Sequence, residues 1–377
     1  MEQIFSTFEW GLIGSVLFLF IIQLYYCFAV GGRIAFYNLK KRSLTDAKPP
    51  VSIILSARNE AEILQHTLPK ILSQNYPLFE VIVVNDCSED DSDILLASLQ
   101  AVHPHLVYRT IVKDDVFAHS KKMALGLGIK AAQYDLCLFI DADCFPASNE
   151  WLAGMQQFFA SKTEVVLAYT RLDPKKNARW VRADRFMQAL HYLGRAMARR
   201  PYMGVGSNMA FRKQLFFDNK GFDMRITKNL REDRIFINQV ATAHNTAVAI
   251  APSMTTISTI KITSSLWLLH RCEELRSFAL CEKGARYPAL FESILRTGYY
   301  VLMIMAAILF RNQQAVLFGL LGIELLRAII MSIVFIKSLR KLGEKGLWFL
   351  LMCWHFIYPF VHIALIIVSK FSHKPRK

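Results

Sequence analysis

The sequence predicts an α/β protein with a mostly parallel central sheet, helices on both faces of the sheet, and flanking transmembrane helices. Beyond Pro50, short apolar runs alternate with helical patterns, which is typical of parallel strands joined by crossover helices. Hydrophobic residues make up 53% of the 377 residues, and the excess lies at the two ends of the chain. We therefore expect a soluble middle domain between membrane segments.

The N-terminal segment, residues 1–45, is expected to be a membrane anchor and linker. No charged residue occurs between Glu9 and Arg33, and this run is long enough to cross a bilayer. It lacks a basic leader and a small-residue cleavage site, so it does not resemble a removable signal peptide. Basic residues follow at Arg33 and at 40–42, which by the positive-inside rule places the middle domain in the cytoplasm.

A C-terminal transmembrane region is expected over residues 289–377. Glu324 and Arg327 lie within it, at a spacing that allows them to pair on one helix face. The sequence leaves open whether two or three of its apolar segments span the membrane. These segments lie near 289–310, 313–336 and 347–369.

Residues 264–288 are expected to form an amphipathic helix on the membrane surface. Such a helix lies in the interface with its apolar side toward the lipid. Its apolar side would carry Trp267, Leu275, Phe278 and Leu280.

The charge and cysteine patterns exclude several classes of protein. The formal net charge is +15, but the basic residues are scattered or lie beside apolar runs, so we expect a membrane surface and no nucleic acid as the partner. The seven cysteines form no Cys-x-x-Cys pair, which argues against a zinc site. No phosphate-binding loop of the Walker type is present, and Gly126-Leu127-Gly128 lacks the third glycine of a dinucleotide motif.

The middle domain is assigned to residues 46–263. Its first part reads as a regular alternation of strands and helices, and ligands of such sheets bind at the carboxyl ends of the strands. The expected strands are 51–56, 79–85, 106–112 and 136–140, and the expected helices are 61–74, 90–100 and 119–133.

Polar clusters follow three of these strands. Arg58 and Glu60 follow the first strand, Asp86 ends the second, and Asp141 and Asp143 follow the fourth. Because strand side chains alternate, the last two carboxylates leave on the same side of the sheet, as ligands of a hard divalent cation do. Each cluster taken alone is also explained as a turn. Three clusters on one sheet edge favour a binding site.

Three later segments carry further candidate residues. Lys121 and Lys122 begin a helix from which an ammonium can reach a phosphate, although a solvated lysine pair is the simpler explanation. The segment containing Gly206, Ser207 and Asn208 suits a cavity wall, because glycine allows the backbone to approach a ligand closely. A plain turn before a strand is the alternative.

The pair Glu232-Asp233 begins another expected helix. Acidic residues in a first turn also stabilise the helix dipole, which is the alternative reading of this pair. Neighbouring helix positions point about 100° apart, so at most one of the two carboxylates faces a given pocket. We choose Asp233 as the functional one.

Together these motifs resemble the membrane-bound family 2 glycosyltransferases, which are inverting enzymes with the GT-A fold. The resemblance covers roughly residues 48–280, and residues 201–240 are similar to cell-envelope glycosyltransferases of Bacteroides-like bacteria. The matching segments are Pro50 to Glu60, Val83 to Asp86, Ser120 to Leu125, Asp141 to Asp143, Gly204 to Phe211, and Glu232-Asp233.

The resemblance implies roles for these residues. Arg58, Glu60 and Asp86 would hold the nucleoside of a nucleotide-diphosphate sugar, with a UDP-sugar as the first choice, and Lys121 or Lys122 would steady the nucleotide. Asp141 and Asp143 would hold Mg²⁺ or Mn²⁺ on the diphosphate. Asp233 would be the general base toward the acceptor. The donor-sugar or acceptor pocket would include Gly206, Ser207, Asn208 and Glu232.

The implied function is single transfer of a sugar, with inversion, to a lipid-linked or envelope-glycan acceptor at the cytoplasmic face of a bacterial inner membrane. Two departures from the family pattern qualify it: Arg234 follows the acidic pair where many relatives have a third acid, and the family's Gln-x-x-Arg-Trp motif is replaced. The corresponding positions here are His270, Glu273 and Glu274. The replaced motif favours single transfer over polymerisation. Both departures also motivate the alternative of a non-catalytic membrane subunit of a polysaccharide assembly complex. A nucleotidyltransferase would need a glycine-rich loop after the first strand, and this chain lacks one.

Overall fold

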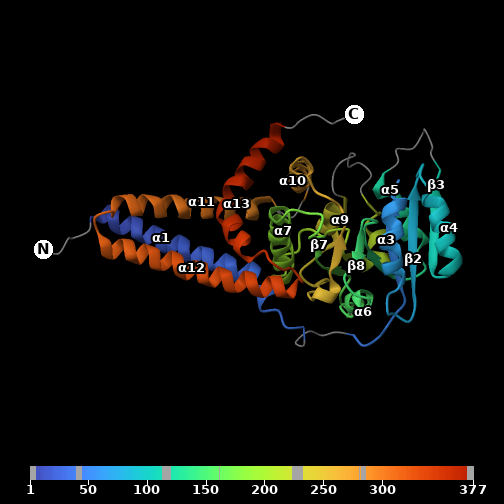
Figure 1. Ribbon diagram of the computed structural model, residues 1–377. Helices are drawn as coiled ribbons and strands as arrows, with labels where there is room; N and C mark the ends of the chain where they lie inside the picture. Colours follow the sequence, from blue (N-terminus) through green and yellow to red (C-terminus); the bar gives the residue numbers. More distant parts are fainter. Residues whose placement is uncertain are drawn as a thin grey trace.

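The computed structural model describes residues 6–39, 45–112, 120–160, 162–222, 232–279, 281 and 286–371. A mixed α/β domain forms one end of the molecule, and a bundle of long apolar helices forms the other (Figure 1). The fold class expected from the sequence is confirmed: the central sheet is mostly parallel and apolar helices flank the domain in the sequence.

Four parallel strands make up the first half of the central sheet. Their order is β3-β2-β1-β4, and all of them run in the same direction. β4 is continuously buried, and β1 and β2 are buried except for Ser56 and Phe79, as expected for a mainly apolar sheet covered on both faces. The strands are β1 (Val51–Ala57), β2 (Phe79–Asp86), β3 (Leu106–Ile111) and β4 (Leu136–Phe139).

The order of these strands determines where a ligand binds. The chain moves from β1 outward through α3 (Ala61–Leu72), β2 and α4 (Ser92–Val102) to β3. It then returns through α5 (Lys121–Ala131) to β4, on the other side of β1. Because such crossovers are right-handed, reversing direction moves the helix to the opposite face of the sheet. The reversal leaves a crevice at the carboxyl ends of β1 and β4, which is the usual ligand site of such sheets.

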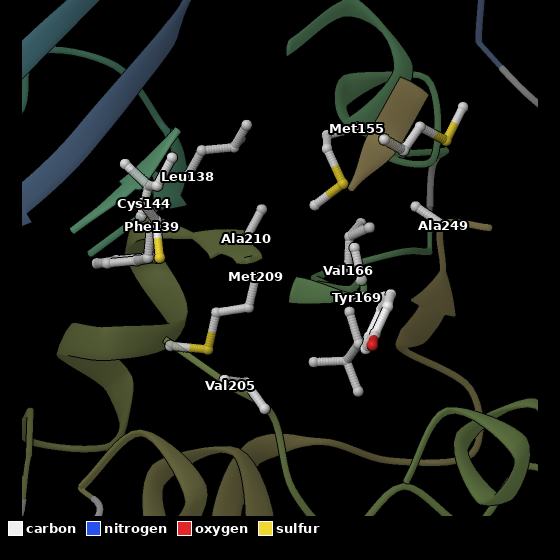
Figure 2. Packing of buried hydrophobic residues seen from close by; sticks show 14 of the residues in the cluster. Leu138, Phe139, Cys144, Met155, Val166, Tyr169, Val205, Met209, Ala210 and Ala249 are labelled. Carbon is white, nitrogen blue, oxygen red and sulfur yellow. The ribbon is translucent and has the colours of Figure 1, made fainter. Parts of the chain in front are cut away.

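The second half of the sheet differs from the simple parallel pattern. β8 (Met209–Arg212) lies antiparallel between β4 and β6 (Val165–Leu167), and β9 (Thr246–Val248) completes the seven strands. In register, Ala210 of β8 pairs with Leu138 on one side and Val166 on the other, and Figure 2 shows it between them. Because β8 is antiparallel to β4, the segment that precedes β8 lies near the carboxyl end of β4, next to the crevice.

A small second sheet lies beside the crevice. β10 (Thr256–Ser258) pairs antiparallel with β5 (Cys144–Pro146) and parallel with β7 (Thr170–Leu172). β5 begins directly after Asp143, so this sheet holds the segment that carries the acidic pair. The remaining helices of the domain are α6 (Trp151–Gln156), α7 (Arg179–Met197), α8 (Lys213–Asp218) and α9 (Glu232–Val240).

Four helices are long and apolar enough to cross a membrane, by length and composition. α1 (Thr7–Tyr26) continues through a π-helical turn and α2 to Ala35, and α1 lies beside α11 and α12 in one bundle (Figure 1). α13 runs across the end of this bundle, next to α7 and α10. The C-terminal helices are α11 (Arg286–Leu309), α12 (Gln314–Lys341) and α13 (Trp348–Phe371).

Charged groups inside the bundle are paired. The expected pair within α12 is confirmed, since Arg327 Nη2 lies 2.6 Å from Glu324 Oε1. Arg296 and Glu292 pair in the same way one turn apart on α11. Pairing lowers the cost of placing charges among apolar helices.

The turn between α12 and α13 connects the bundle to the α/β domain. Glu344 in this turn accepts hydrogen bonds from Arg182 Nη2 at 2.5 Å and from the Tyr169 hydroxyl at 3.0 Å, both in the domain. All three side chains are buried. The domain is therefore attached to the bundle through a buried ion pair as well as through the chain.

α10 (Ser264–Ala279) packs between the domain and α13. Trp267 was expected on a lipid-facing side, but its indole ring packs with Trp180 of α7 and Trp354 of α13, and its Nε1 donates to Asp184 Oδ2 at 2.8 Å. The exposed apolar residues of the helix are instead Leu268 and Leu269. The side chains of Phe278 and Leu280 lie outside the described residues.

Candidate active site

A cavity of about 690 Å³ lies at the carboxyl ends of the strands, where the topology predicts it. Most of the residues singled out in the sequence line this one cavity, although they come from six separate segments. They are Arg58, Glu60, Asp86, Lys121, Lys122, Asp141, Asp143, Gly206, Ser207 and Asp233.

The loops after β1 and β2 hold each other in place at one end of the cavity. Asn59 adopts a φ of 54°, a left-handed conformation that asparagine tolerates better than most residues. Its backbone N–H donates to Ser88 Oγ at 2.9 Å, and its side-chain oxygen accepts from the N–H of Glu89 at 2.7 Å. This exchange fixes the backbone that follows Arg58 and Asp86, two of the three residues expected to hold a nucleoside.

Asp141 and Asp143 converge as their spacing predicted. Ligand atoms of Asp141, Asp143 and the neighbouring Cys144 lie within 4.8 Å of one another. Asp143 is held in place by β10, because Ser258 Oγ donates to its Oδ2 at 2.6 Å and Thr259 donates to its backbone oxygen. Ser258 is a site residue that the sequence analysis missed.

The donor atoms fit a hard divalent cation. Two carboxylates offer oxygen ligands, which Mg²⁺ and Mn²⁺ prefer. Burial, with the adjacent carboxylates, raises the pKa of the Cys144 thiol well above its usual value, and its Sγ donates to Asp143 Oδ1 at 3.3 Å. The site therefore suits an oxygen-ligated metal better than zinc.

The two lysines of α5 have different environments. Lys121 Nζ pairs with Asp141 Oδ1, and half of its side chain is exposed. Lys122 is buried and also lines the cavity. Ser120 caps the helix by accepting from the N–H of Met123. Both lysines therefore line the cavity that holds the acidic pair, and Lys121 contacts this pair directly.

Glu60 shares the cavity with the acidic pair. Burial, reinforced by the negative charge of Asp143, raises the pKa of its carboxyl group to about 7. Asp141 acts in the same direction and Lys121 in the opposite one. Glu60 lies in the loop after β1, but its carboxyl group therefore also interacts electrostatically with Asp141 and Asp143.

Asp233 is held by the glycine segment. The backbone N–H of Gly206 donates to Asp233 Oδ2 at 2.6 Å. A Cβ atom at Gly206 would lie 3.2 Å from that oxygen, and one at Gly204 would lie 3.0 Å from Ile237 of α9. These glycines let the segment approach α9 closely, and the expected approach of the backbone to a ligand stays a prediction.

Ser207 and Asn208 depart from the expected pocket role in different degrees. Ser207 lines the cavity, but its hydroxyl donates to Thr170 Oγ1. Asn208 is fully buried and is not among the residues that line the cavity, so its assignment to the pocket needs correction. Its amide donates to the carbonyls of Tyr169 and Met254, and its oxygen accepts from Trp151 Nε1.

The side chain of Glu232 lies outside the described residues, although its backbone begins α9. Arg234, which departs from the family pattern, is buried and pairs with Glu274 of α10 at 3.1 Å. Glu274 stands at one of the positions that replace the family's Gln-x-x-Arg-Trp motif. The two departures therefore meet in one ion pair.

Further residues complete the cavity wall. Arg185 of α7 lines it, as do His270 and Glu273 of α10. In the sequence, the last two stand out only as departures from the family motif, and Arg185 was not predicted because no polar motif marks α7. Helix α10 thus supplies one wall of the cavity.

Comparison with known proteins agrees with this geometry. Residues 52–218 match the family model described as glycosyl transferase family 2. The chain contains a family 2 glycosyltransferase domain. This domain includes β1 to α8, and therefore the acidic pair, both lysines and the Gly206 segment, but ends before Asp233.

Curated relatives of this glycosyltransferase domain are polymer synthases. A poly-beta-1,6-N-acetyl-D-glucosamine synthase of Staphylococcus aureus is 28% identical over 140 residues, which are 37% of this chain and 30% of the relative. The synthase of Staphylococcus epidermidis is 33% identical over 93 residues, or 25% and 21% of the two chains. The chain thus matches under a third of these relatives' length. The expected likeness to enzymes of Bacteroides-like bacteria stays a prediction.

The fold extends beyond the matched domain. A mannosyltransferase from Pyrobaculum calidifontis, solved with GDP-mannose and Mn²⁺, superposes with a TM-score of 0.56 and 17% identity over 90% of this chain and 99% of that chain. The expected GT-A fold of the glycosyltransferase domain is confirmed.

Proposed function

We propose that this protein is a metal-assisted, inverting glycosyltransferase that moves one sugar from a nucleoside-diphosphate donor to a membrane-associated acceptor. The observation that carries the proposal is that one cavity is lined by the acidic pair Asp141 and Asp143, by two lysines, and by Asp233 from a separate helix. These are the groups needed to bind a diphosphate and to accept a proton from an attacking hydroxyl.

The donor lies across the ends of β1, β2 and β4. Asp86 and Arg58, on the interlocked loops, hold the nucleoside, for which a UDP-sugar is the first choice. Asp141 and Asp143 would hold Mg²⁺ or Mn²⁺, which when bound would neutralise the charge that develops on the leaving diphosphate. Lys121 and Lys122 add positive charge on the same side, and Ser258 keeps Asp143 oriented.

The acceptor reacts at Asp233. Its carboxylate removes the proton from the acceptor hydroxyl, the oxygen forms a bond to the anomeric carbon, and the bond from that carbon to the diphosphate breaks. A single displacement of this kind inverts the anomeric configuration. Gly206 holds the carboxylate in place through its backbone N–H, and the cavity wall from α10 faces the acceptor side.

The domain faces the cytoplasm of a bacterial inner membrane. Two basic helix ends support this orientation. Arg33 lies at the end of the first apolar helix, and Lys337 Nζ lies 4.3 Å from the ring of Phe36 just after it. Arg340 and Lys341 end α12 beside the turn that docks on the domain. Clusters of basic residues favour the cytoplasmic side.

The acceptor is a lipid-linked or envelope-glycan hydroxyl, because the cavity shares helix α10 with the membrane region. Replacement of the family's Gln-x-x-Arg-Trp motif by His270, Glu273 and Glu274 favours transfer of one sugar. The names of the curated relatives make N-acetylglucosamine donors the first to test.

The test is a donor panel with purified full-length protein in detergent. UDP- and GDP-sugars, each with Mn²⁺ or Mg²⁺, are scored by thermal shift and by release of the free nucleoside diphosphate. We expect one donor to raise the melting temperature only with metal and to be turned over. A protein that binds no donor and releases no diphosphate across the panel, while co-purifying with a polysaccharide synthase complex, would instead support the non-catalytic subunit.

A further inference from the structure

Four buried charged side chains form a continuous series of ion pairs, here called the ion chain, that runs from α7 through α10 to α9, the helix that carries Asp233. Arg271 of α10 lies between Asp184 of α7, at 3.7 Å, and Glu274, at 2.6 Å. Glu274 in turn pairs with Arg234 of α9 at 3.1 Å. No more than 5% of any of these residues is exposed. The charges alternate in sign and balance, which is the condition under which buried ions are tolerated.

The ion chain ends at Arg234, which directly follows the proposed base Asp233 in the sequence. Neighbouring residues of a helix point about 100° apart. Asp233 points to the cavity and to Gly206, whereas Arg234 points to α10 and Glu274. The first turn of α9 is therefore held on two sides, by a backbone hydrogen bond and by an ion pair.

Helix α10 is itself held firmly. Trp267 Nε1 donates to Asp184 Oδ2 at 2.8 Å, and Arg271 Nη2 donates to the Tyr358 hydroxyl of α13 at 3.1 Å. Burial alone would lower the pKa of Arg271, but the carboxylates of Asp184 and Glu274 raise it well above its usual value, so the guanidinium stays charged. The ion chain therefore gives Arg234 a fixed partner.

We propose that Arg234 is a positioning residue for Asp233: through its ion pair with Glu274, it sets the distance between the base carboxylate and the cavity wall formed by α10. This inference rests on the proposed function of Asp233 as the general base. Without the Arg234 guanidinium, two buried carboxylates, Asp184 and Glu274, share the single charge of Arg271, and the first turn of α9 loses its ion pair with α10.

The expected effect is on turnover and not on donor binding. Arg234 lies outside the residues that line the cavity, and the groups assigned to the donor come from β1, β2, β4 and α5. A displacement of about 1 Å at a catalytic group can lower a rate by about a hundredfold. We therefore expect Arg234→Met to lower kcat by about 10- to 100-fold while the donor KM stays within about twofold of wild type.

A matched control separates positioning from general stability. Arg182 and Glu344 also form a buried ion pair, at 2.5 Å, and it too joins two parts of the chain. This pair attaches the α12–α13 turn to α7, and among the described residues it forms no hydrogen bond or ion pair with α9. Arg182→Met should lower the melting temperature about as much as Arg234→Met, but leave kcat within about twofold when it is measured well below that temperature.

The experiment measures kcat and donor KM of the full-length protein, with Mn²⁺, the donor selected by the panel, and vesicles containing a lipid-linked glycan with free hydroxyl groups as acceptor. The variants are Arg234→Met, Arg234→Lys, Glu274→Gln, Arg182→Met and Asp233→Asn. Arg234→Lys keeps the charge and should recover most of kcat. Glu274→Gln should reproduce the kcat defect, which keeps the test available if Arg234→Met fails to fold.

The outcomes are distinct. If Asp233→Asn is inactive, a wild-type kcat in Arg234→Met overturns the positioning role of Arg234 but not the proposed function. Where Arg234→Met does not fold, a wild-type kcat in Glu274→Gln has the same meaning. The inference is also overturned if Arg182→Met loses as much kcat as the Arg234 variant does. A fully active Asp233→Asn overturns the role of Asp233 as the base, and with it both proposals.

Discussion

The backbone N–H of Gly206 donates to Asp233 Oδ2 at 2.6 Å, so the carboxylate assigned as the base is oriented by the chain segment that leads into β8. Little space separates the two residues, since a Cβ at Gly206 would lie 3.2 Å from that oxygen. The other carboxylate oxygen, Oδ1, would then be the one that meets the acceptor hydroxyl.

Gly206→Ala should lower kcat by about tenfold with little change in donor KM, because the added methyl group displaces the base and not the donor site. The measurement is steady-state release of nucleoside diphosphate. Gly126→Ala is the control, since its Cβ would meet Phe216 at an ordinary distance of 3.8 Å and alanine favours the helix there. Equal kcat values in the two variants would contradict the role of this contact.

Ser258→Ala should weaken Mn²⁺ binding by about tenfold, because the hydroxyl orients Asp143 and second partners of metal ligands typically have effects of this size. A Mn²⁺ titration of the thermal shift, at saturating donor, measures the change. Ser98→Ala removes an exposed hydroxyl that donates to a carbonyl within α4, far from any assigned metal ligand in the sequence. It should leave the titration unchanged. An unchanged midpoint in Ser258→Ala would remove Ser258 from the site.

Glu60 predicts a pH dependence of stability in metal-free buffer. Its ordinary pKa is 4.5, whereas burial and Asp143 raise it to about 7 in the folded protein. Between these pH values the folded state binds one proton more than the unfolded state, so this group makes the free energy of unfolding fall as pH rises. The loss is complete above about pH 7.

Glu60→Gln removes this titration. The melting temperature of the variant, relative to wild type, should therefore rise between pH 5 and pH 8 with EDTA present. Parallel profiles over this range would show that Glu60 has a normal pKa.

Asn208→Ala should destabilise the protein by on the order of 3 kcal/mol, because it leaves buried partners of the amide without hydrogen bonds. The folded fraction should retain its donor KM, since Asn208 does not line the cavity. Thermal unfolding and donor KM are both measured. Asn219→Ala, at an exposed asparagine that bonds to a local carbonyl, should cost little. A raised donor KM in Asn208→Ala would return this residue to the pocket.

The parallel half of the sheet was predictable because its signals are local. β1, β2 and β4 are apolar runs bounded by turn residues, and the polar residues after each run indicate the sheet edge. The acidic pair followed from a spacing of two along an extended chain.

The other half was not predictable in the same way. β6 and β10 have three residues each, which is too short for a periodic pattern, and β8 reverses direction between its neighbours. Ser258 contacts Asp143 across 115 positions of sequence. Asn208 follows two residues that line the cavity, and the sequence does not reveal that its own side chain points into the core.

The departure at Arg234 shows how context decides the meaning of a motif. Considered alone, a basic residue after the acidic pair argued against catalysis. In the structure it pairs with Glu274, another departure from the family pattern, so the two substitutions compensate each other in charge.

The most direct test of the whole proposal compares Asp143→Ala with Asp233→Asn in the full-length protein, using Mn²⁺-dependent donor binding and transfer as two separate readouts. We predict that Asp143→Ala abolishes metal-dependent donor binding, whereas Asp233→Asn binds donor as wild type does but transfers the sugar about 100-fold or more slowly. Loss of donor binding in both variants, or transfer at the wild-type rate by Asp233→Asn, would contradict the division between a metal-binding pair and a base.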